Sequence, residues 1–179
     1  MSLNSGKVFP TGKIAKDFNS FMGINISFDF NFWKIHTSYM LNNVNFNTKK
    51  SIVLINNTDT TLLKKNENFN LQNRGIKIGY FLIRNKKFHI TPYACISSIS
   101  LKNIKNNDNN SDKNIEIIQT FGYELGIHTE MKLYDFKKSY YYLSLKLDGG
   151  YTFIPKFNYG YNGNFPYINT ALVFGLNDF

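Results

Sequence analysis

Apolar and polar residues alternate along the segment from Thr120 to Phe136. The odd-numbered positions, one parity of the chain, are apolar except for Thr129: Phe121, Tyr123, Leu125, Ile127, Met131 and Leu133. The even-numbered positions, the other parity, carry glycine, charged residues and a histidine: Gly122, Glu124, Gly126, His128, Glu130 and Lys132. A strand places alternate side chains on opposite faces, whereas a helix would give this segment no apolar stripe. The segment is therefore predicted to be a long, two-faced β-strand.

The same alternation recurs along the chain, and the predicted strands cover residues 20–30, 33–41, 74–84, 88–101, 120–134, 140–152 and 166–176. A further strand near the N terminus would end at Val8 and Phe9. Short turns alternate with long connectors rich in Asn and Lys, which cover residues 42–73, 102–117 and 153–165. Tight connections join antiparallel neighbours. The fold class is therefore predicted to be all-β: one domain over residues 1–179, an antiparallel up-and-down transmembrane β-barrel of eight strands, seven clear and the first short or truncated.

Two local features depart from simple alternation. The piece Ser51 to Ile55 is expected to extend a hairpin above the sheet. In the strand at 88–101 the apolar parity switches to Ile99 and Leu101. A β-bulge inserts one extra residue into a strand, so the switch predicts a bulge near Ser97 and Ser98.

Alternation alone does not say which face of the barrel is outside. Small residues relieve crowding inside a narrow barrel, and seven glycines lie on the polar parity: Gly23, Gly75, Gly79, Gly122, Gly126, Gly150 and Gly175. A Lys on a lipid-facing position would cost roughly 2–4 kcal/mol at the bilayer midplane, and the apolar parity has none within its strands. The apolar face is therefore predicted to face lipid. The polar face is predicted to form a lumen network of Asp29, Lys34, His36, Lys77, Glu124, His128, Glu130, Lys132, Lys146 and Asp148.

Aromatic residues gather near both edges of the predicted barrel, as in interfacial girdles. The set beside the short turns is Trp33, Phe88, Tyr134, Phe136, Tyr140 and Tyr141. The set toward the long connectors is Tyr39, Phe121, Tyr151, Phe153, Phe165 and Tyr167. Two such belts favour a barrel that crosses a membrane.

With these strands, alternating connectors and the terminal aromatic Phe179, nearly the whole chain resembles the small, porin-like outer-membrane β-barrel proteins of Gram-negative bacteria. The resemblance implies a cell-envelope protein in the bacterial outer membrane, in contact with its lipid. It also implies short periplasmic turns, long outer loops, an even number of strands and a cleaved signal peptide. The chain departs from this family in two ways. Only seven strands are clear, and no signal peptide is visible. N-terminal truncation or processing within the first strand would explain both. Phe179 is also out of phase with Leu176.

The composition limits the classes of partner that the chain could bind. The formal charge of +9 would suit binding to nucleic acid, but the lysines are scattered as pairs through successive connectors and form no basic stripe. No nucleic-acid partner is predicted, and anionic lipid headgroups suit the charge better. Cys95 is the only cysteine, so no disulfide forms within the chain. No apolar run reaches the ~18 residues of a membrane-spanning helix.

Few residues could carry chemistry. His36 and Ser38 share a strand face, as do His128 and Glu130, and either pair could supply a base with its partner. Ordinary hydrogen bonding in the lumen explains both pairs more simply. His36, His89 and His128 lie on three strands without ligand spacing, so no metal or cofactor is predicted.

An eight-stranded barrel fills its interior with side chains. The prediction is therefore a non-enzymatic barrel with a plugged polar lumen, which acts through its long extracellular loops in envelope structure or in contacts with a surface or protein partner. One alternative is a soluble lipocalin-type barrel that binds an apolar ligand. The other is an outer-membrane lipid-modifying hydrolase built around His36 and Ser38.

Overall fold

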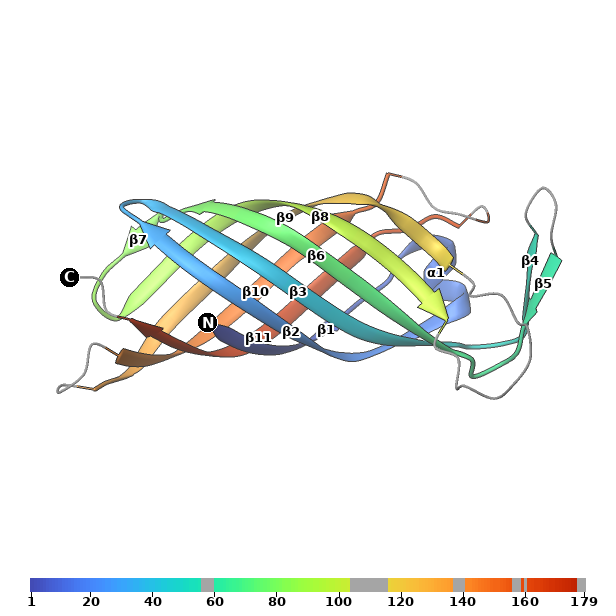
Figure 1. Ribbon diagram of the computed structural model, residues 1–179, viewed down its shortest axis with the longest axis horizontal. Coiled ribbons are helices and arrows are strands. Elements are labelled where there is room, and N and C mark those ends of the chain that lie inside the picture. Colours follow the sequence, from blue (N-terminus) through green and yellow to red (C-terminus); the bar gives the residue numbers. More distant parts are fainter. Residues whose placement is uncertain (56–59, 104–115, 137–140, 156–158, 160, 177–179) are drawn as a thin grey trace.

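The chain forms a closed, eight-stranded, antiparallel up-and-down β-barrel in a computed structural model that describes residues 1–55, 60–103, 116–136, 141–155, 159 and 161–176 (Figure 1). The barrel strands are β1 (Ser2–Val8), β2 (Phe18–Phe32), β3 (Ile35–Thr48), β6 (Asn68–Tyr80), β8 (Phe88–Asn103), β9 (Glu116–Asp135), β10 (Tyr141–Phe153) and β11 (Phe165–Leu176). Each pairs with the next along the chain, and β1 pairs with β11 to close the barrel. The predicted all-β, eight-stranded, antiparallel up-and-down barrel is confirmed.

Strand β1 completes the barrel, and it is short. Ser2 pairs with Ser27 of β2 and with Val173 of β11, so the last residues of both neighbours extend past it. Its outward residues are Leu3, Ser5 and Lys7. A short first strand that ends at Val8 and Phe9 was predicted, and β1 confirms it with its end at Val8; its alternation is weak because only one of these three outward residues is apolar.

Strands β3 and β6 are longer than predicted. They continue through residues 42–48 and 68–73, which the Asn-rich composition had assigned to a connector. The alternation persists there with its sense reversed: Val44 and Phe46 are buried, while Asn43 and Asn45 are exposed. The connector that remains holds a small hairpin of β4 (Ile52–Ile55) and β5 (Thr60–Leu63), as the apolar piece at Ser51–Ile55 indicated.

The bulge predicted near Ser97 and Ser98 is wrong. The pairing of β6 with β8 runs without interruption through Gly75–Ser97, Arg74–Ser98 and Asn73–Ile99. Ile99 and Leu101 point inward like Ser97, and both are fully buried. The parity switch therefore marks a change in what fills the barrel, not a change in the strand.

The barrel consequently has two halves of opposite polarity. In the short-turn half, which contains the turns β2–β3, β6–β8 and β9–β10, apolar side chains face outward and polar ones inward. In the long-loop half, which contains the far ends of β3, β6, β8 and β9, the order is reversed. Its inward side chains include Phe46, Phe69, Leu71, Ile99 and Leu101, and its outward ones include Asn43, Asn45, Gln72, Lys102 and Gln119.

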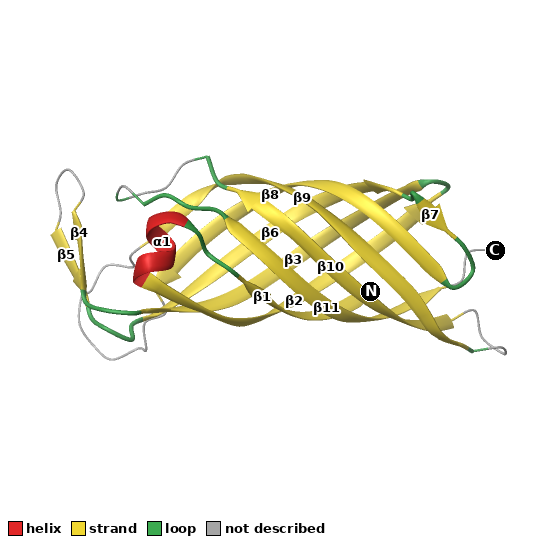
Figure 2. Ribbon diagram, turned by 180° about the vertical axis from the view of Figure 1, so that it is seen from behind, coloured by secondary structure: helices red, strands yellow, loops and turns green. Residues whose placement is uncertain are grey.

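The remaining elements lie at the two ends of the barrel. Helix α1 (Gly12–Asp17) and the β4–β5 hairpin are at the long-loop end, and β7 (Ile83–Arg84) is at the other (Figure 2). Gly12 and Gly163 have positive φ, and a Cβ on either would meet the opposing backbone, so glycine allows the 161–164 segment to approach α1. No helix in the described part of the chain is long and apolar enough to cross a membrane.

Candidate functional site

Five side chains from five strands meet in the interior of the short-turn half. Lys77 Nζ lies 2.7 Å from Asp148 Oδ2 and 3.3 Å from Glu124 Oε1. The Tyr93 hydroxyl accepts a hydrogen bond from Lys77 at 3.2 Å and donates one to Asp148 Oδ1 at 2.5 Å. Tyr167 donates to Glu124. We call these five residues the central network, and all of them are buried.

The central network balances one buried ammonium against two buried carboxylates. Removing charges from water is costly, and their attraction compensates only when additional hydrogen bonds satisfy the remaining groups. Tyr93 and Tyr167 supply those bonds, because each hydroxyl donates to a carboxylate. Interior glycines make room for the tyrosines: a Cβ on Gly150 would lie 2.6 Å from the Tyr167 hydroxyl.

A second cluster lies beside the central network. Lys146 Nζ is 3.2 Å from Asp29 Oδ1, and His36 Nε2 is 3.6 Å from the same oxygen. The rings of His36 and His128 lie 4.5 Å apart between centroids. Glu130 accepts a hydrogen bond from Ser144. The second cluster therefore continues the buried polar interior.

Both clusters link strands that are not neighbours. Lys77 on β6 and Asp148 on β10 are separated by β8 and β9, and Asp29 on β2 and Lys146 on β10 are separated by β1 and β11. Such contacts must cross the barrel interior. We call these two contacts, Lys77 to Asp148 and Lys146 to Asp29, the ionic struts, because each connects opposite walls of the barrel.

Of the residues predicted for the lumen, Lys34 lies outside it and Lys132 lies at its mouth. Lys34 is exposed in the β2–β3 turn, where its ammonium sits 5.9 Å from the Trp33 ring centroid. The alternation placed it inward because the strand was predicted to begin at Trp33, whereas β3 begins at Ile35 and Lys34 lies in the turn before it. Lys132 lies near the rim, 3.5 Å from the Asp135 carboxylate and above the Tyr142 ring.

The His36 and Ser38 pair does not have the geometry of a base and its nucleophile. His36 Nδ1 lies 2.8 Å from Asn31 Oδ1, and Nε2 faces Asp29. Both ring nitrogens are therefore directed at groups other than Ser38. Both side chains are buried, at 2% exposure, so an attacking hydroxyl would be shielded from a lipid substrate outside the barrel.

Phe81 lies at the short-turn end of the interior. Its ring is buried between His36 and His89, at 6.0 and 5.6 Å between centroids, and the Arg84 guanidinium lies 4.8 Å from it. Beyond Phe81 a cavity of about 400 Å³ opens, lined in part by Arg84, Lys86 and Lys132. The short-turn mouth therefore has a cationic rim.

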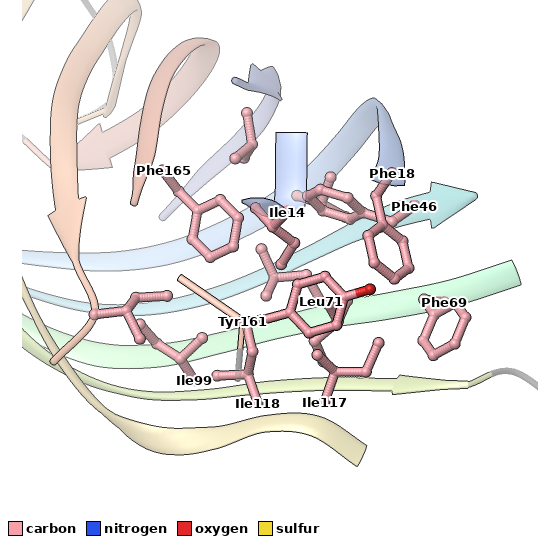
Figure 3. Close-up of a cluster of buried hydrophobic side chains, with 14 of the residues drawn as sticks. Ile14, Phe18, Phe46, Phe69, Leu71, Ile99, Ile117, Ile118, Tyr161 and Phe165 are labelled. Atoms are coloured by element: carbon pink, nitrogen blue, oxygen red, sulfur yellow. The ribbon is translucent and has the colours of Figure 1, made fainter. Parts of the chain in front are cut away.

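Apolar side chains fill the interior of the long-loop half (Figure 3). Ile14 of α1 and Tyr161 reach in from the end segments and join Phe18, Phe46 and Phe69 from the barrel wall. The cluster also includes Leu54 and Leu63 of the β4–β5 hairpin, whose other side exposes Val53, Ile55 and Leu62.

Tyr161 also carries the polar link of this end. Its hydroxyl donates to Asp17 Oδ2 at 3.1 Å, and Lys50 lies 3.2 Å from the other carboxylate oxygen. Burial and the adjacent carboxylate raise the pKa of the Tyr161 hydroxyl above its usual range, so it remains a donor at neutral pH. The link ties the 161–164 segment to the end of α1.

The aromatic belts are only partly as predicted. Trp33, Tyr134, Phe136 and Tyr141 are exposed beside the short turns, and Phe88 is half-buried, while Tyr140 lies outside the described residues. In the second belt, Tyr39, Phe121 and Phe153 are exposed. Phe165 and Tyr167 were placed there wrongly, because they are buried and point into the barrel.

Tyr93 and Tyr167 of the central network were not predicted from the sequence as members of the lumen network. Both lie on the polar, inward parity of their strands, and that position was the available signal. They were overlooked because the network was assembled from charged groups and histidines alone.

Comparison with known proteins gives no match among protein-family models, curated protein sequences or solved structures. Within the described ranges, no group of three or more His, Cys, Asp or Glu side chains is placed to hold a metal ion.

Proposed function

We propose that the chain is a non-enzymatic integral β-barrel protein of a Gram-negative outer membrane, with a closed interior, which acts through its long-loop end. The observation that carries the proposal is the reversal of polarity along the barrel. Each half is consistent only with its own surroundings. An apolar exterior around a charged interior suits lipid, and an amide-rich exterior around an apolar interior suits water.

The dimensions of the apolar exterior support this environment. On β2 it runs from Met22 to Phe32, which are both well exposed. At ~3.3 Å per residue and a tilt of ~40°, this run spans about 25 Å along the barrel axis, which matches the apolar band of outer-membrane barrels.

A closed interior follows from the side chains within it. Eight strands enclose just enough space for side chains. Along the barrel axis from the short-turn mouth, that space is occupied first by Phe81, then by the two polar clusters and then by the apolar cluster. We therefore expect no wide-pore conductance.

The soluble lipocalin-type alternative requires an apolar interior able to hold a ligand. The buried Lys77, Glu124 and Asp148 oppose it, because they would place the ionic groups inside and a broad apolar surface in water. The hydrolase alternative is opposed by the burial of Ser38 and the orientation of His36.

Activity is assigned to the long-loop end because its elements project beyond the barrel wall. The β4–β5 hairpin stands outside the barrel end in both views (Figures 1 and 2). Its exposed Val53, Ile55 and Leu62 suit contact with an envelope or surface partner.

A matched pair of substitutions on β9 tests the membrane assignment. Ile127 is 53% exposed within the apolar exterior, and Gln119 is exposed in the long-loop half of the same strand. Ile127→Arg is expected to destabilise the barrel in lipid by about 2–4 kcal/mol, and Gln119→Arg by less than about 1 kcal/mol. Urea unfolding in phosphatidylcholine vesicles, followed by the loss of the heat-dependent shift in SDS electrophoresis, measures both. Equal effects of the two variants, or a wild-type barrel that stays folded and soluble without detergent, would refute the proposal.

A further inference from the structure

The mouth of the short-turn half is a cavity of about 400 Å³, which is large enough for a small molecule. Four strands line it from their inward faces, with Asn31 on β2, His89 on β8, Lys132 on β9 and Tyr142 on β10. Strand β7 and the turn after it add Arg84, Asn85 and Lys86. The cavity therefore belongs to the open end of the barrel and does not depend on what surrounds the outer wall.

The wall of this cavity carries an excess of positive charge. Arg84, Lys86 and Lys132 each contribute a cation, and none of the described residues that line the cavity is acidic. Asp135 lies 3.5 Å from the Lys132 ammonium, but its side chain is half exposed and can compensate one of the three charges. A concave site with charges of one sign and low-dielectric walls concentrates ions of the opposite sign. The mouth therefore favours anions.

Hydrogen bonds hold the cationic elements in place around the cavity. The Asn85 side chain accepts two backbone hydrogen bonds within the turn, at 2.9 and 2.8 Å, and so fixes the backbone that carries Lys86. The Arg84 guanidinium donates to the Trp33 carbonyl oxygen in the β2–β3 turn. The backbone N–H of Lys132 donates to a carbonyl oxygen of the Asn85 turn at 2.8 Å. A site arranged in advance loses less conformational freedom when a ligand binds.

The geometry of the cations suits phosphate. Strand β7 pairs with β8 and β8 pairs with β9, and neighbouring strands lie about 4.8 Å apart, so this part of the wall is about 10 Å wide. A phosphate directs its oxygens to several sides at once, whereas a single carboxylate is planar and faces one side. The Arg84 fork matches two phosphate oxygens, and a lysine meets a third as a point charge.

We propose that the short-turn mouth binds a phosphate-bearing anion, with Arg84 as the forked contact and with Lys86 and Lys132 as the flanking charges. This site lies at the end of the barrel opposite to the loops that carry the proposed function, and it adds a second, separate binding activity. A soluble molecule and a lipid headgroup at the rim carry the same phosphate chemistry, and competition between the two distinguishes them.

Isothermal titration calorimetry with sodium pyrophosphate tests the site on protein refolded in non-ionic detergent micelles at low ionic strength. Wild type is expected to bind one pyrophosphate. Lys132→Gln is expected to weaken binding about tenfold, which corresponds to one charge-assisted hydrogen bond. Lys86→Gln is expected to weaken it about threefold, because Lys86 is exposed and its charge is more strongly screened.

Lys34→Gln is the matched control, because Lys34 is an exposed cation at the same end of the barrel that does not line the cavity. It is expected to bind pyrophosphate like wild type. Phosphatidylglycerol added to the micelles identifies the source of the phosphate: competition with pyrophosphate assigns the site to a headgroup, and undiminished pyrophosphate binding assigns it to a soluble molecule.

Three results would overturn the phosphate site. They are the absence of pyrophosphate binding to folded wild type, equal affinities of wild type, Lys86→Gln and Lys132→Gln, and tighter binding of citrate than of pyrophosphate. Circular dichroism is recorded first on every sample, so that a weaker affinity is compared only between folded barrels. Because pyrophosphate binding reports on the barrel mouth and the heat-dependent shift in SDS reports on the membrane assignment, either proposal can fail without the other.

Discussion

The short-turn and long-loop halves are built from the same strands but obey opposite rules. Along β3, His36, Ser38 and Met40 point inward with Ile35 and Tyr39 outward, and a few residues later Val44 and Phe46 point inward with Asn43 and Asn45 outward. The pleat does not change. What changes is the polarity of the side chains on each face, which supports the proposal that the surroundings of the barrel differ along its axis.

The two halves are also held together differently. The short-turn half depends on directional contacts across the interior, such as Lys77 to Asp148 and Lys146 to Asp29. The long-loop half depends on packing, with Phe18 and Phe69 edge to face at 5.3 Å between centroids. On its outside, Asn70 Nδ2 donates to Asn45 Oδ1 at 3.1 Å, an amide contact between β6 and β3. Ionic struts are sensitive to a lost partner, and packed clusters to lost volume.

The largest effect is expected from removing the central cation. Lys77→Met leaves Asp148 and Glu124 buried without their ammonium, and breaking a buried pair in this way costs about 3–5 kcal/mol. Urea unfolding of the barrel in micelles measures the change. The control is Lys132→Met at the rim, where the Asp135 partner is half exposed and the expected loss is below about 1 kcal/mol. Similar losses for the two variants would show that the struts do not hold the short-turn half.

Loss of packing volume should be felt mainly in the long-loop half. Phe46 is fully buried in the apolar cluster, and Phe46→Ala is expected to cost about 3–5 kcal/mol through the cavity it leaves. Phe28→Ala removes the same atoms from the outer face of the short-turn half, where lipid can fill the space, and should cost clearly less. The same unfolding assay compares them. A larger loss for Phe28→Ala would contradict the assignment of the two faces.

A smaller effect is expected where the end segments join the long-loop half. Tyr161→Phe keeps the ring in the cluster but removes the hydrogen bond to Asp17, at a cost of about 1.5–3 kcal/mol. Hydrogen exchange should rise in α1 and at residues 161–164 while β9 and β10 stay protected. Uniformly faster exchange throughout the barrel would show that this link does more than hold the end segments.

Most of the barrel could be predicted from alternation, because apolar residues recur at every second position in each strand with an apolar outer face, such as β9 and β2. The inward direction of the polar parity was also readable, from its glycines and paired charges. The inward position of many interior side chains could be predicted from this alternation, including those of Asp29, His36, Lys77 and Glu124.

What escaped prediction has a common physical origin. Residues 42–73 were assigned to one long connector because they are rich in Asn and Lys, yet residues 42–48 continue β3, with the polarity of its two faces reversed. The supposed bulge at Ser97 was the same reversal seen on β8. Strand β1 was predicted as a short strand with little apolar alternation, and its pairing with β2 and β11 shows that it closes the barrel.

If the exterior passes from lipid to water along each strand, site-directed spin labelling of β9 will detect the change. Single cysteines at Gln119, Phe121, Leu125, Ile127 and Leu133, in a Cys95→Ser background, would carry the label on the outer face of the protein reconstituted in vesicles. The account predicts high accessibility to oxygen and low accessibility to a water-soluble nickel chelate from Phe121 to Leu133, with the opposite balance at Gln119. Equal exposure of all five labels to the chelate would contradict it and would place the entire barrel in water.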